Sequence, residues 1–541
     1  MARADVGLME KLHNLWRQST SSERSVVVLT SILLLGITLS YLYAQSLQRR
    51  KLPPGPRPWP IVGNFPSMSG DTPHRSLFKL ANKYGGLMYL RFGSVPCIVV
   101  STAEVARELF QTHDANFSSR PRRLVWRVLH NYDDNFKVMG SAPYGPYWRN
   151  LRKFFNEEMF SPKCLAAREG IRMEEIQHMS AILLDDAQQG RVVNLKRWLW
   201  GVTSNTITRI FCNRRFYGPD QNEQDREEFE QMTAGILSAL GAFVISDYIP
   251  SLSFIARLQG WEKKFESVYA LSTRISEKMF EVEKHRERVL KGRESGQIDM
   301  NYVPDFVDVF LTKPLEGGKL FPDEDIILFL KHMLNAGTDT SATMVEWTMA
   351  ELIRKPDIMK RAQEELDAVV GSRQFVQESD FAHLPFLEAI VKEGFRVHPP
   401  SPLPIIRESL QPCEFRGYKL PAKTLLLNNI FAIHRDPAVY EDPDEFRPER
   451  FLDRPEINHL AHFSSFELIP FGVGRRMCPG STLGHVMVML MLGNLLFRFQ
   501  WSMPEGLKVE DIDMSEAGGL TMWMKSPLCL VATPRTPLSK P

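Results

Sequence analysis

The feature that most constrains this chain is the loop around Cys478, which reads Phe-Gly-Val-Gly-Arg-Arg-Met-Cys-Pro-Gly over positions 471–480. Its glycines let the backbone turn closely and point N–H groups at the sulfur. Such hydrogen bonds tune the donor strength of a metal-bound thiolate. An isolated cysteine is usually a small buried hydrophobe. This loop precedes an apolar helical run from Leu483 to Phe499, and the combination instead favours a thiolate presented to a metal.

The Phe-x-x-Gly-x-Arg-x-Cys-x-Gly arrangement resembles the haem-ligand loop of the cytochrome P450 family, in which a cysteine thiolate holds the iron. The resemblance implies a mainly α-helical fold with a smaller β region, and haem b with Cys478 as the axial ligand. Arg476 would supply a cation to the anionic edge of the cofactor, and Phe471 a flat apolar wall. Gly472 and Gly480 would shape the loop around the sulfur.

Composition is that of an ordinary globular protein. The chain has 541 residues, of which 43% are hydrophobic and 24% charged. Its 66 basic and 64 acidic side chains leave a formal charge of +2, so we expect no nucleic-acid partner. The six cysteines form no CxxC pair, which argues against a disulfide framework and a zinc signature and fits a reducing, cytosol-facing location.

The N-terminal region predicts a membrane anchor. Residues 25–48 carry no charge, and 24 helical residues span roughly 36 Å, enough to cross a hydrocarbon core of about 30 Å. A cleaved signal peptide is the alternative, but its apolar region runs only about 7–15 residues. We therefore expect a tail (1–24), a transmembrane helix (25–48), a basic, proline-rich hinge (49–63) and one catalytic domain (64–541).

Charge predicts the orientation of the anchor only weakly. Four basic residues follow it and three lie close before it, which places the large domain in the cytosol by one charge, and Arg3 would cancel that margin. The prolines after the anchor favour a stiff extended spacer. An anchor followed by such a hinge resembles the start of microsomal cytochromes P450, which implies a single-pass protein of the endoplasmic reticulum.

Secondary structure after the hinge is expected to be mostly helical. The pattern predicts a hairpin over 86–93 and 96–101, and a helix from Ala103 to His113. A long helix should open near Phe321 and end before Pro356, followed by two more helices up to Val397. Residues 419–427 read as strand and turn.

A local anomaly lies within the long helix, in the sequence Ala-Gly-Thr-Asp-Thr-Ser at 336–341. A mid-helix glycine costs about 1 kcal/mol relative to alanine, and such violations are expected at functional positions. The threonine hydroxyls can bond helix carbonyls. A solvated polar turn is the alternative. The family resemblance implies an oxygen-binding groove instead, with Ala336 and Gly337 bordering the cofactor, Thr340 holding the oxygen or its water, and Asp339 relaying protons.

Two charged sets complete the resemblance. Glu393 and Arg396 share a helix face with apolar neighbours, so they should be buried and fully hydrogen-bonded. With Arg450 they match the family's structural Glu-Arg-Arg triad. Trp148 and Arg152, spaced i,i+4, could be an ordinary surface pair. The family pattern makes them haem-propionate contacts, together with Arg407 and Arg476, since buried anions need paired cations.

Motifs at 118–121, 144–148 and 448–451 resemble plant microsomal A-type members specifically. Phe431 departs mildly, because relatives usually carry Trp there. The implied reaction is monooxygenation of a lipophilic or aromatic small molecule with O₂. Because no dinucleotide fingerprint follows a strand, the electrons should come from NADPH through the membrane-bound NADPH–cytochrome P450 reductase, with cytochrome b5 as a second candidate donor. Arg149, Lys153 and Arg475 are the expected docking face.

Substrate identity is left open by the sequence. The segments expected to line the pocket are mostly apolar: 119–133, 243–249, 334–340, 402–406 and 517–522. Phenylpropanoid or flavonoid hydroxylation is favoured, with terpenoid, fatty-acid and amino-acid or oxime substrates as alternatives. Relatives that rearrange or dehydrate without O₂ usually lack an acid–Thr pair, which Asp339 and Thr340 supply. A membrane-tethered haem-binding sensor is the alternative of another class, and turnover with NADPH and reductase would distinguish it.

Overall fold

The computed structural model describes residues 20, 26, 28–30, 36, 51–68, 72–133, 136–218, 223–295, 304–315, 317–461, 463 and 465–535. The chain divides into two compact units. One consists of Met1–Pro53 with Cys413–Leu420, and the other of Pro54–Pro412 with Pro421–Pro541. In the first unit, β5 (Cys413–Phe415) and β6 (Tyr418–Leu420) form an antiparallel hairpin. All the candidate site residues lie in the second, larger unit.

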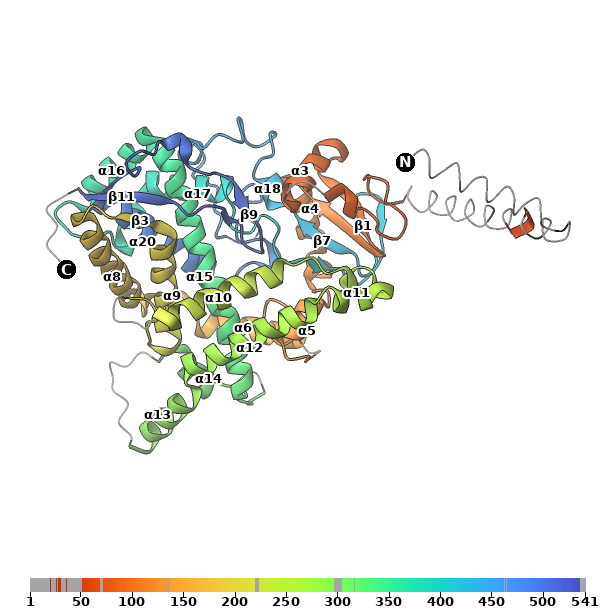
Figure 1. The fold of residues 1–541 in the computed structure, drawn as a ribbon, viewed down its shortest axis with the longest axis horizontal. Coiled ribbons are helices and arrows are strands. Elements are labelled where there is room, and N and C mark those ends of the chain that lie inside the picture. Colours follow the sequence, from red (N-terminus) through yellow and green to blue (C-terminus); the bar gives the residue numbers. More distant parts are fainter. Residues whose placement is uncertain are drawn as a thin grey trace. The chain divides into compact units, whose positions relative to one another are not determined.

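Helices dominate the larger unit (Figure 1). Its α-helices are α3 (Pro73–Tyr84), α4 (Ala103–His113), α5 (Leu124–Leu129), α6 (Pro146–Glu158), α7 (Pro162–Ala166), α8 (Glu169–Gln188), α9 (Leu195–Cys212), α10 (Glu223–Gly241), α11 (Ser253–Leu258), α12 (Trp261–Phe280), α13 (Val282–Ser295), α14 (Phe306–Thr312), α15 (Asp323–Arg354), α16 (Pro356–Val370), α17 (Pro385–Val397), α18 (Ile430–Ile433), α19 (Glu449–Leu452) and α20 (Ser481–Arg498). Short 3₁₀ helices are η1 (Phe65–Met68), η2 (Asn116–Ser118), η3 (Ile245–Asp247), η4 (Pro250–Leu252), η5 (Glu378–His383), η6 (Gly474–Arg476) and η7 (Val509–Asp511).

In the described part of this unit, the strands form three small sheets. Their strands are β1 (Leu87–Phe92), β2 (Val95–Val100), β3 (Val192–Asn194), β4 (Arg407–Glu408), β7 (Leu425–Asn428), β8 (Phe499–Ser502), β9 (Glu516–Ala517), β10 (Trp523–Met524) and β11 (Cys529–Pro534). The orders are β1-β2-β7-β4, β3-β11-β8 and β10-β9. The predicted hairpin is confirmed, with Phe92 opposite Val95 across the turn. β7 lies parallel to β2, which brings residues more than 300 positions apart side by side (Figure 1).

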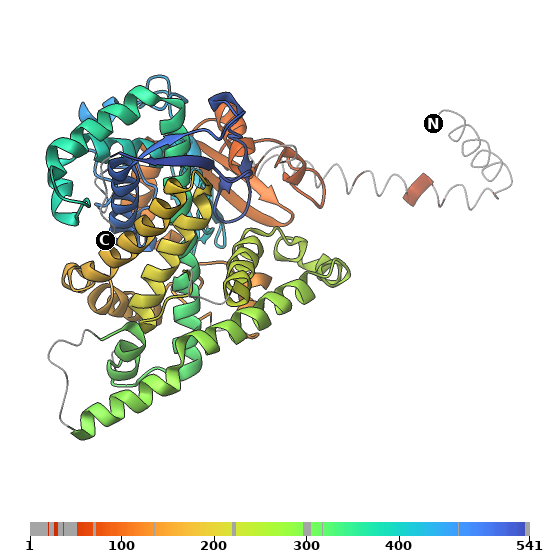
Figure 2. The same cartoon turned by 60° about the vertical axis from the view of Figure 1, so that its left-hand side comes forward.

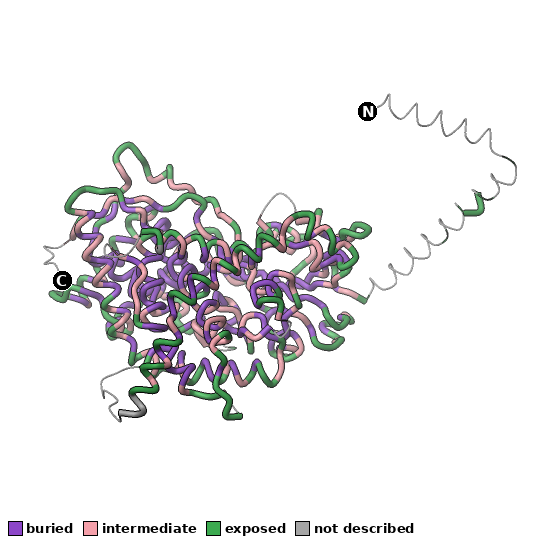
Figure 3. The backbone as a smooth tube through the Cα atoms, turned by 60° about the horizontal axis from the view of Figure 1, so that its bottom comes forward, coloured by how far each residue is buried: buried purple, intermediate pink, exposed green. Residues whose placement is uncertain are grey.

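The long helix α15 has the bounds that the sequence predicts. Asp323, Glu324 and Asp325 occupy its first turn, where negative charge suits the helix dipole, and Pro356 begins α16 just beyond its end. Almost every side chain from Ser341 to Ile353 is buried. The apolar core extends from α15 over α16, α17 and α20. Figure 3 shows the buried segments (purple) gathered inside the fold, with exposed segments (green) around them. A second cluster packs around α9, α10 and α12, and the helices α10–α13 gather on one side of the unit (Figure 2).

The sequence predicts two apolar helices, one from Leu483 to Phe499 and the membrane anchor at 25–48. The first is helical only to Arg498, because Phe499 begins β8. Among the described residues, α20 is the one helix long and apolar enough to cross a membrane, yet 78% of it is buried inside the fold, as expected for a core helix. The predicted anchor (25–48) lies outside the described residues except for Val26, Val28, Leu29, Thr30 and Gly36, which are helical.

Candidate active site

The cysteine loop is held by its own backbone. The Cys478 N–H donates to the Phe471 carbonyl (2.9 Å) and the Met477 N–H to the Gly474 carbonyl (2.9 Å). Gly472 and Gly474 adopt φ values of +72° and +73°, a left-handed conformation that favours glycine. Cys478 is half-buried and lies three residues before Ser481, where α20 begins. Burial raises the pKa of its thiol, whereas the Gly480 N–H and the Arg152 charge oppose that rise by stabilising the thiolate.

Asp114, which follows α4, clamps this loop. Its carboxylate accepts the Arg475 backbone N–H (3.1 Å) and forms ion pairs with the side chains of Arg475 (3.2 Å) and Arg407 (3.4 Å). It also occupies the space where a Cβ on Gly474 would lie. Burial raises the pKa of Asp114, and the two arginines oppose that shift. Sequence reasoning missed Asp114, because a lone acid after a helix carries no motif of its own.

Four buried or half-buried guanidinium groups gather beside the loop: Arg120, Arg152, Arg407 and Arg476. Arg152 donates to the Met477 carbonyl (2.8 Å), and Arg476 to the carbonyls of Ser118 (2.7 Å) and Met139 (3.0 Å). Trp148 on α6 donates to the same Met139 carbonyl (3.1 Å), and the Arg476 guanidinium stacks over its ring at 4.3 Å. The structure therefore brings together the four residues predicted to contact the haem propionates, which are Trp148, Arg152, Arg407 and Arg476.

These cations crowd one another. Burial and the charges of Arg407 and Arg152 lower the pKa of Arg476 to about 9, and burial lowers that of Arg407 to about 10. Burial and the charges of Arg476 and Arg407 also lower the pKa of Arg120. Asp114 is the one described carboxylate that forms an ion pair within this set. Arg120 also belongs to this arginine cluster. The sequence marks it only as part of the motif at 118–121 and does not predict its place beside the cysteine loop.

The anomalous turn of α15 presents two different surfaces. Thr340 is half-buried and donates to the Ala336 carbonyl (2.9 Å), while Thr338 is buried and donates to the Leu334 carbonyl (2.9 Å), as predicted for these hydroxyls. Ala336 is exposed on an otherwise largely buried helix. A Cβ added to Gly337 would lie 3.0 Å from the Ile207 side chain of α9. The element that packs closely against the backbone here is therefore α9.

Asp339 points elsewhere. It is completely buried, and its Oδ1 accepts the indole N–H of Trp200 on α9 (3.1 Å). Its Oδ2 has no hydrogen-bond partner among the described residues. Burial raises the pKa of Asp339, opposed by Lys196, Thr521 and Trp200. The carboxyl can therefore hold a proton more readily than an exposed aspartate.

The charged triad forms as the sequence predicts. Arg396 makes two hydrogen bonds to Glu393 (2.7 and 2.8 Å), and Arg450 donates to the same carboxylate (3.0 Å). All three are buried. Arg396 also donates to the carbonyls of His434 and Glu445, so the charges are fully hydrogen-bonded. The network ties α17 to α19 and to the residues before α19, His434 and Glu445.

A cavity of ≈ 400 Å³ opens beside Ser119 and Arg120. Three of the five segments expected to line a pocket contribute to it, through residues 119–123, 247–248 and 406, whereas 334–340 and 517–522 do not. Its wall includes Arg122, Arg123, Asp247 and Lys423. This cavity is therefore more charged than the apolar pocket that the sequence predicts.

Comparison with known proteins decides the family. The family model "Cytochrome P450" matches residues 53–530. The chain belongs to the cytochrome P450 family. Similar curated proteins include a flavonoid 3'-monooxygenase of Crocosmia x crocosmiiflora (38% identity over 513 residues, covering 93% of this chain and 97% of the relative). Another is the strychnine-11-hydroxylase of Strychnos nux-vomica (37% identity over 498 residues, covering 91% and 93%). A zebrafish cytochrome P450 solved with progesterone superposes with a TM-score of 0.70 at 25% identity, covering 86% of this chain and 100% of that one.

Family and fold confirm the predictions of a mainly α cytochrome P450 fold and of haem with a cysteine thiolate ligand. The chain is an oxidoreductase of the monooxygenase class that works with a redox partner and a small-molecule substrate. The residues around Cys478 fit a bound haem. The buried guanidinium cluster, with Asp114 as its one described carboxylate partner, matches a cofactor that carries carboxylates, and the half-buried thiol of Cys478 lies beside Arg152 and the Gly480 N–H.

Proposed function

We propose that this cytochrome P450 hydroxylates a flavonoid- or phenylpropanoid-like aromatic substrate in plant specialised metabolism. The observation that carries the proposal is similarity over nearly the whole chain to flavonoid 3'-monooxygenases and flavonoid 3',5'-hydroxylases from several plants. The strychnine-11-hydroxylase shows that relatives of equal identity are named for a different substrate. Terpenoid, fatty-acid and oxime substrates are therefore tested beside the aromatic ones.

The roles proposed for the chain's own residues rest on the family pattern and on their surroundings. Cys478 supplies the thiolate, and Arg152, Arg407 and Arg476, with Trp148, hold the carboxylate edge of the haem. Phe471, Gly472 and Gly480 would shape the loop around the sulfur. Ala336, exposed on α15, would border the cofactor, and Gly337, whose Cβ direction faces Ile207 of α9, would lie next to it. When bound, haem supplies the activation of O₂. Thr340 offers a hydroxyl from the half-buried face of α15 and orients water or oxygen there. Asp339, whose pKa is raised by burial, would hold a proton beside this face of α15.

The partner in electron transfer is NADPH–cytochrome P450 reductase, with cytochrome b5 as a second donor. An exposed basic face near the cysteine loop supports this proposal. The side chains of Arg149 and Arg475 both lie over the Tyr144 ring at 5.8 Å, and Lys153 is exposed one helical turn further along α6. Such a face suits a partner that presents acidic side chains, since complementary charge steers association.

The proposed location is the endoplasmic reticulum membrane, with a single anchor (25–48) and a cytosolic catalytic domain (64–541) joined by the hinge (49–63). Support comes from the uncharged N-terminal segment and from the plant relatives. The structural role proposed for Glu393, Arg396 and Arg450 is to hold the segment before the cysteine loop.

A spectral and product screen tests the substrate. Microsomes that contain the protein are titrated with matched sets of flavonoids, cinnamate derivatives, terpenoids, fatty acids and oximes. Ligands that shift the haem spectrum are then incubated with NADPH and reductase. The proposal expects flavonoid or phenylpropanoid ligands to give the tightest spectral binding and an NADPH-dependent product heavier by one oxygen atom. Products from another set alone would reject the substrate class and leave the monooxygenase assignment intact.

A further inference from the structure

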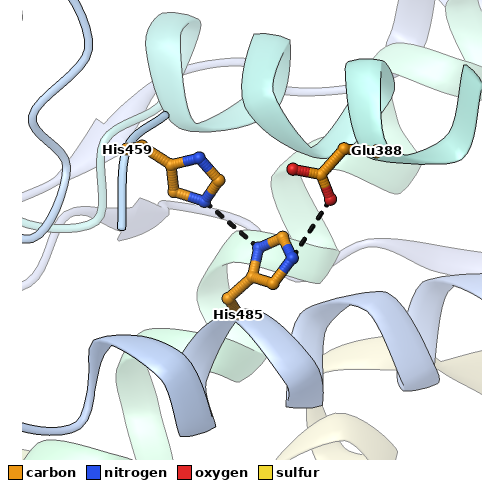
Figure 4. A group of neighbouring side chains, drawn as sticks. All are labelled: Glu388, His459 and His485. Carbon is orange, nitrogen blue, oxygen red and sulfur yellow. Dashed lines mark hydrogen bonds and ion pairs between the residues drawn. The ribbon is translucent and has the colours of Figure 1, made fainter. Parts of the chain in front are cut away.

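A cluster of three side chains remains outside the proposed chemistry. It consists of Glu388 on α17, His459 in the connection after α19, and His485 on α20 (Figure 4). Its two histidines are buried, its glutamate is 28% exposed, and the His459 ring stacks on that of Phe471 in the cysteine loop at 6.0 Å. His459 and His485 are 3% and 8% exposed. One donor atom from each of the three residues lies within 4.8 Å of the others. Three segments of the chain thus converge their side chains on one interior point.

The contacts within this histidine–glutamate cluster form a chain. Nε2 of His485 meets a Glu388 carboxylate oxygen at 3.1 Å, and Nδ1 of His485 meets Nε2 of His459 at 3.1 Å (Figure 4). The remaining nitrogen of His459, Nδ1, is buried without a hydrogen-bond partner among the described residues. Two imidazoles and one carboxylate are a donor set that Zn²⁺ and similar divalent ions prefer.

We propose that Glu388, His459 and His485 form a binding site for a Zn²⁺-class divalent cation. His485 offers the ion one nitrogen. Ligand atoms that lie about 2.0–2.1 Å from zinc are closer together than 4.8 Å, so at least one of the three side chains rotates toward the ion when it binds. Bound there, the cation cross-links α17, α20 and the connection that leads to the cysteine loop.

Lys392 gives the proposal a directional test. Its ammonium lies 3.8 Å from the other Glu388 oxygen, one turn along α17, so its charge opposes a cation at the cluster. Replacing it by the apolar Lys392→Met should tighten metal binding. A second group of buried donors, His285 with Asp305 and Asp308, serves as the matched control. There Arg288 already lies 2.8 Å from Asp308 and 3.2 Å from Asp305, so we expect no metal.

The experiment uses tag-free holoenzyme, stripped with a chelator and titrated with Zn²⁺ alone by calorimetry, with bound metal counted by atomic emission. Wild type should bind one ion in this site. His485→Gln and Glu388→Gln should weaken binding at least about 100-fold, Lys392→Met should strengthen it, and His285→Gln should leave it unchanged. The reduced-CO spectrum reports whether each variant folds, and Glu388→Gln and Lys392→Met keep the test decisive if His485→Gln does not fold. Absence of binding in wild type, or equal binding in every variant, overturns the proposal.

Discussion

Thr340 and Asp339 are neighbours on α15 whose side chains meet different surroundings. The Thr340 hydroxyl lies on the half-buried face and donates to the Ala336 carbonyl, whereas Asp339 is buried against Trp200 on α9. This division suits a pair in which one residue orients the reacting oxygen and the other holds a proton.

Thr340→Ala should uncouple electron use from product formation. The change leaves Cys478 and the arginine cluster untouched, so haem content and the reduced-CO spectrum should stay near normal. NADPH consumption should continue with release of hydrogen peroxide, and the ratio of product to NADPH should fall several-fold. Thr340→Ser, which keeps a hydroxyl, is the control and should retain most coupling. Full coupling in Thr340→Ala would place the relay elsewhere.

Glu346, two turns beyond Asp339, gives a pH-dependent prediction. It is completely buried and accepts the Leu528 N–H (3.0 Å), and burial raises its pKa from 4.5 to about 7. The folded chain thus binds this proton more tightly than the unfolded chain, so stability falls as pH rises from about 4.5 to about 7 and is constant above. Glu346→Gln, which cannot ionise, should be more stable than wild type at pH 8 by roughly 3 kcal/mol.

The measurement for Glu346 is the thermal midpoint of solubilised holoenzyme at pH 8 and at pH 5. The advantage of Glu346→Gln should be present at pH 8 and largely lost at pH 5, where the native carboxyl is itself protonated. A difference of equal size at the two pH values would mean that Glu346 is not the titrating group.

At the scale of elements, the glycines of the cysteine loop provide a matched pair. Gly472 and Gly474 share a φ near +70°, so alanine at either position incurs similar backbone strain. A Cβ at Gly472 would meet nothing within 4 Å, whereas one at Gly474 would collide with Asp114. Gly474→Ala should therefore lower haem incorporation several-fold more than Gly472→Ala, measured as CO-binding haem per total protein. Equal losses would show that Asp114 does not clamp the loop.

Elements with strong local signals could be predicted closely. The helix at Ala103–His113 and the long helix to Arg354 have the expected bounds, since caps, opening acids and Pro356 mark their ends. The sequence did not reveal that α9 packs against Gly337, or that α20 gives way to a strand at Phe499, because both depend on tertiary contacts. Asp114 and Arg120 were missed for the same reason.

At the scale of the whole molecule, topology is the open prediction. Asn116-Phe117-Ser118 is a glycan acceptor sequence that is used only in the lumen. If the catalytic domain faces the cytosol, Asn116 should carry no glycan, and the full-length chain should resist alkaline carbonate extraction from microsomes. Glycan on Asn116, or release of the chain by carbonate, would contradict the proposed topology.

The roles proposed for the residues that hold the haem or act beside it all depend on the assignment of Cys478 as the haem ligand. The most direct test is the reduced-CO difference spectrum of Cys478→Ser and Cys478→His, with haem content measured independently. Loss of the thiolate–haem absorbance band in both variants, even where haem is retained, is the predicted result. An unchanged band in either variant would contradict the assignment.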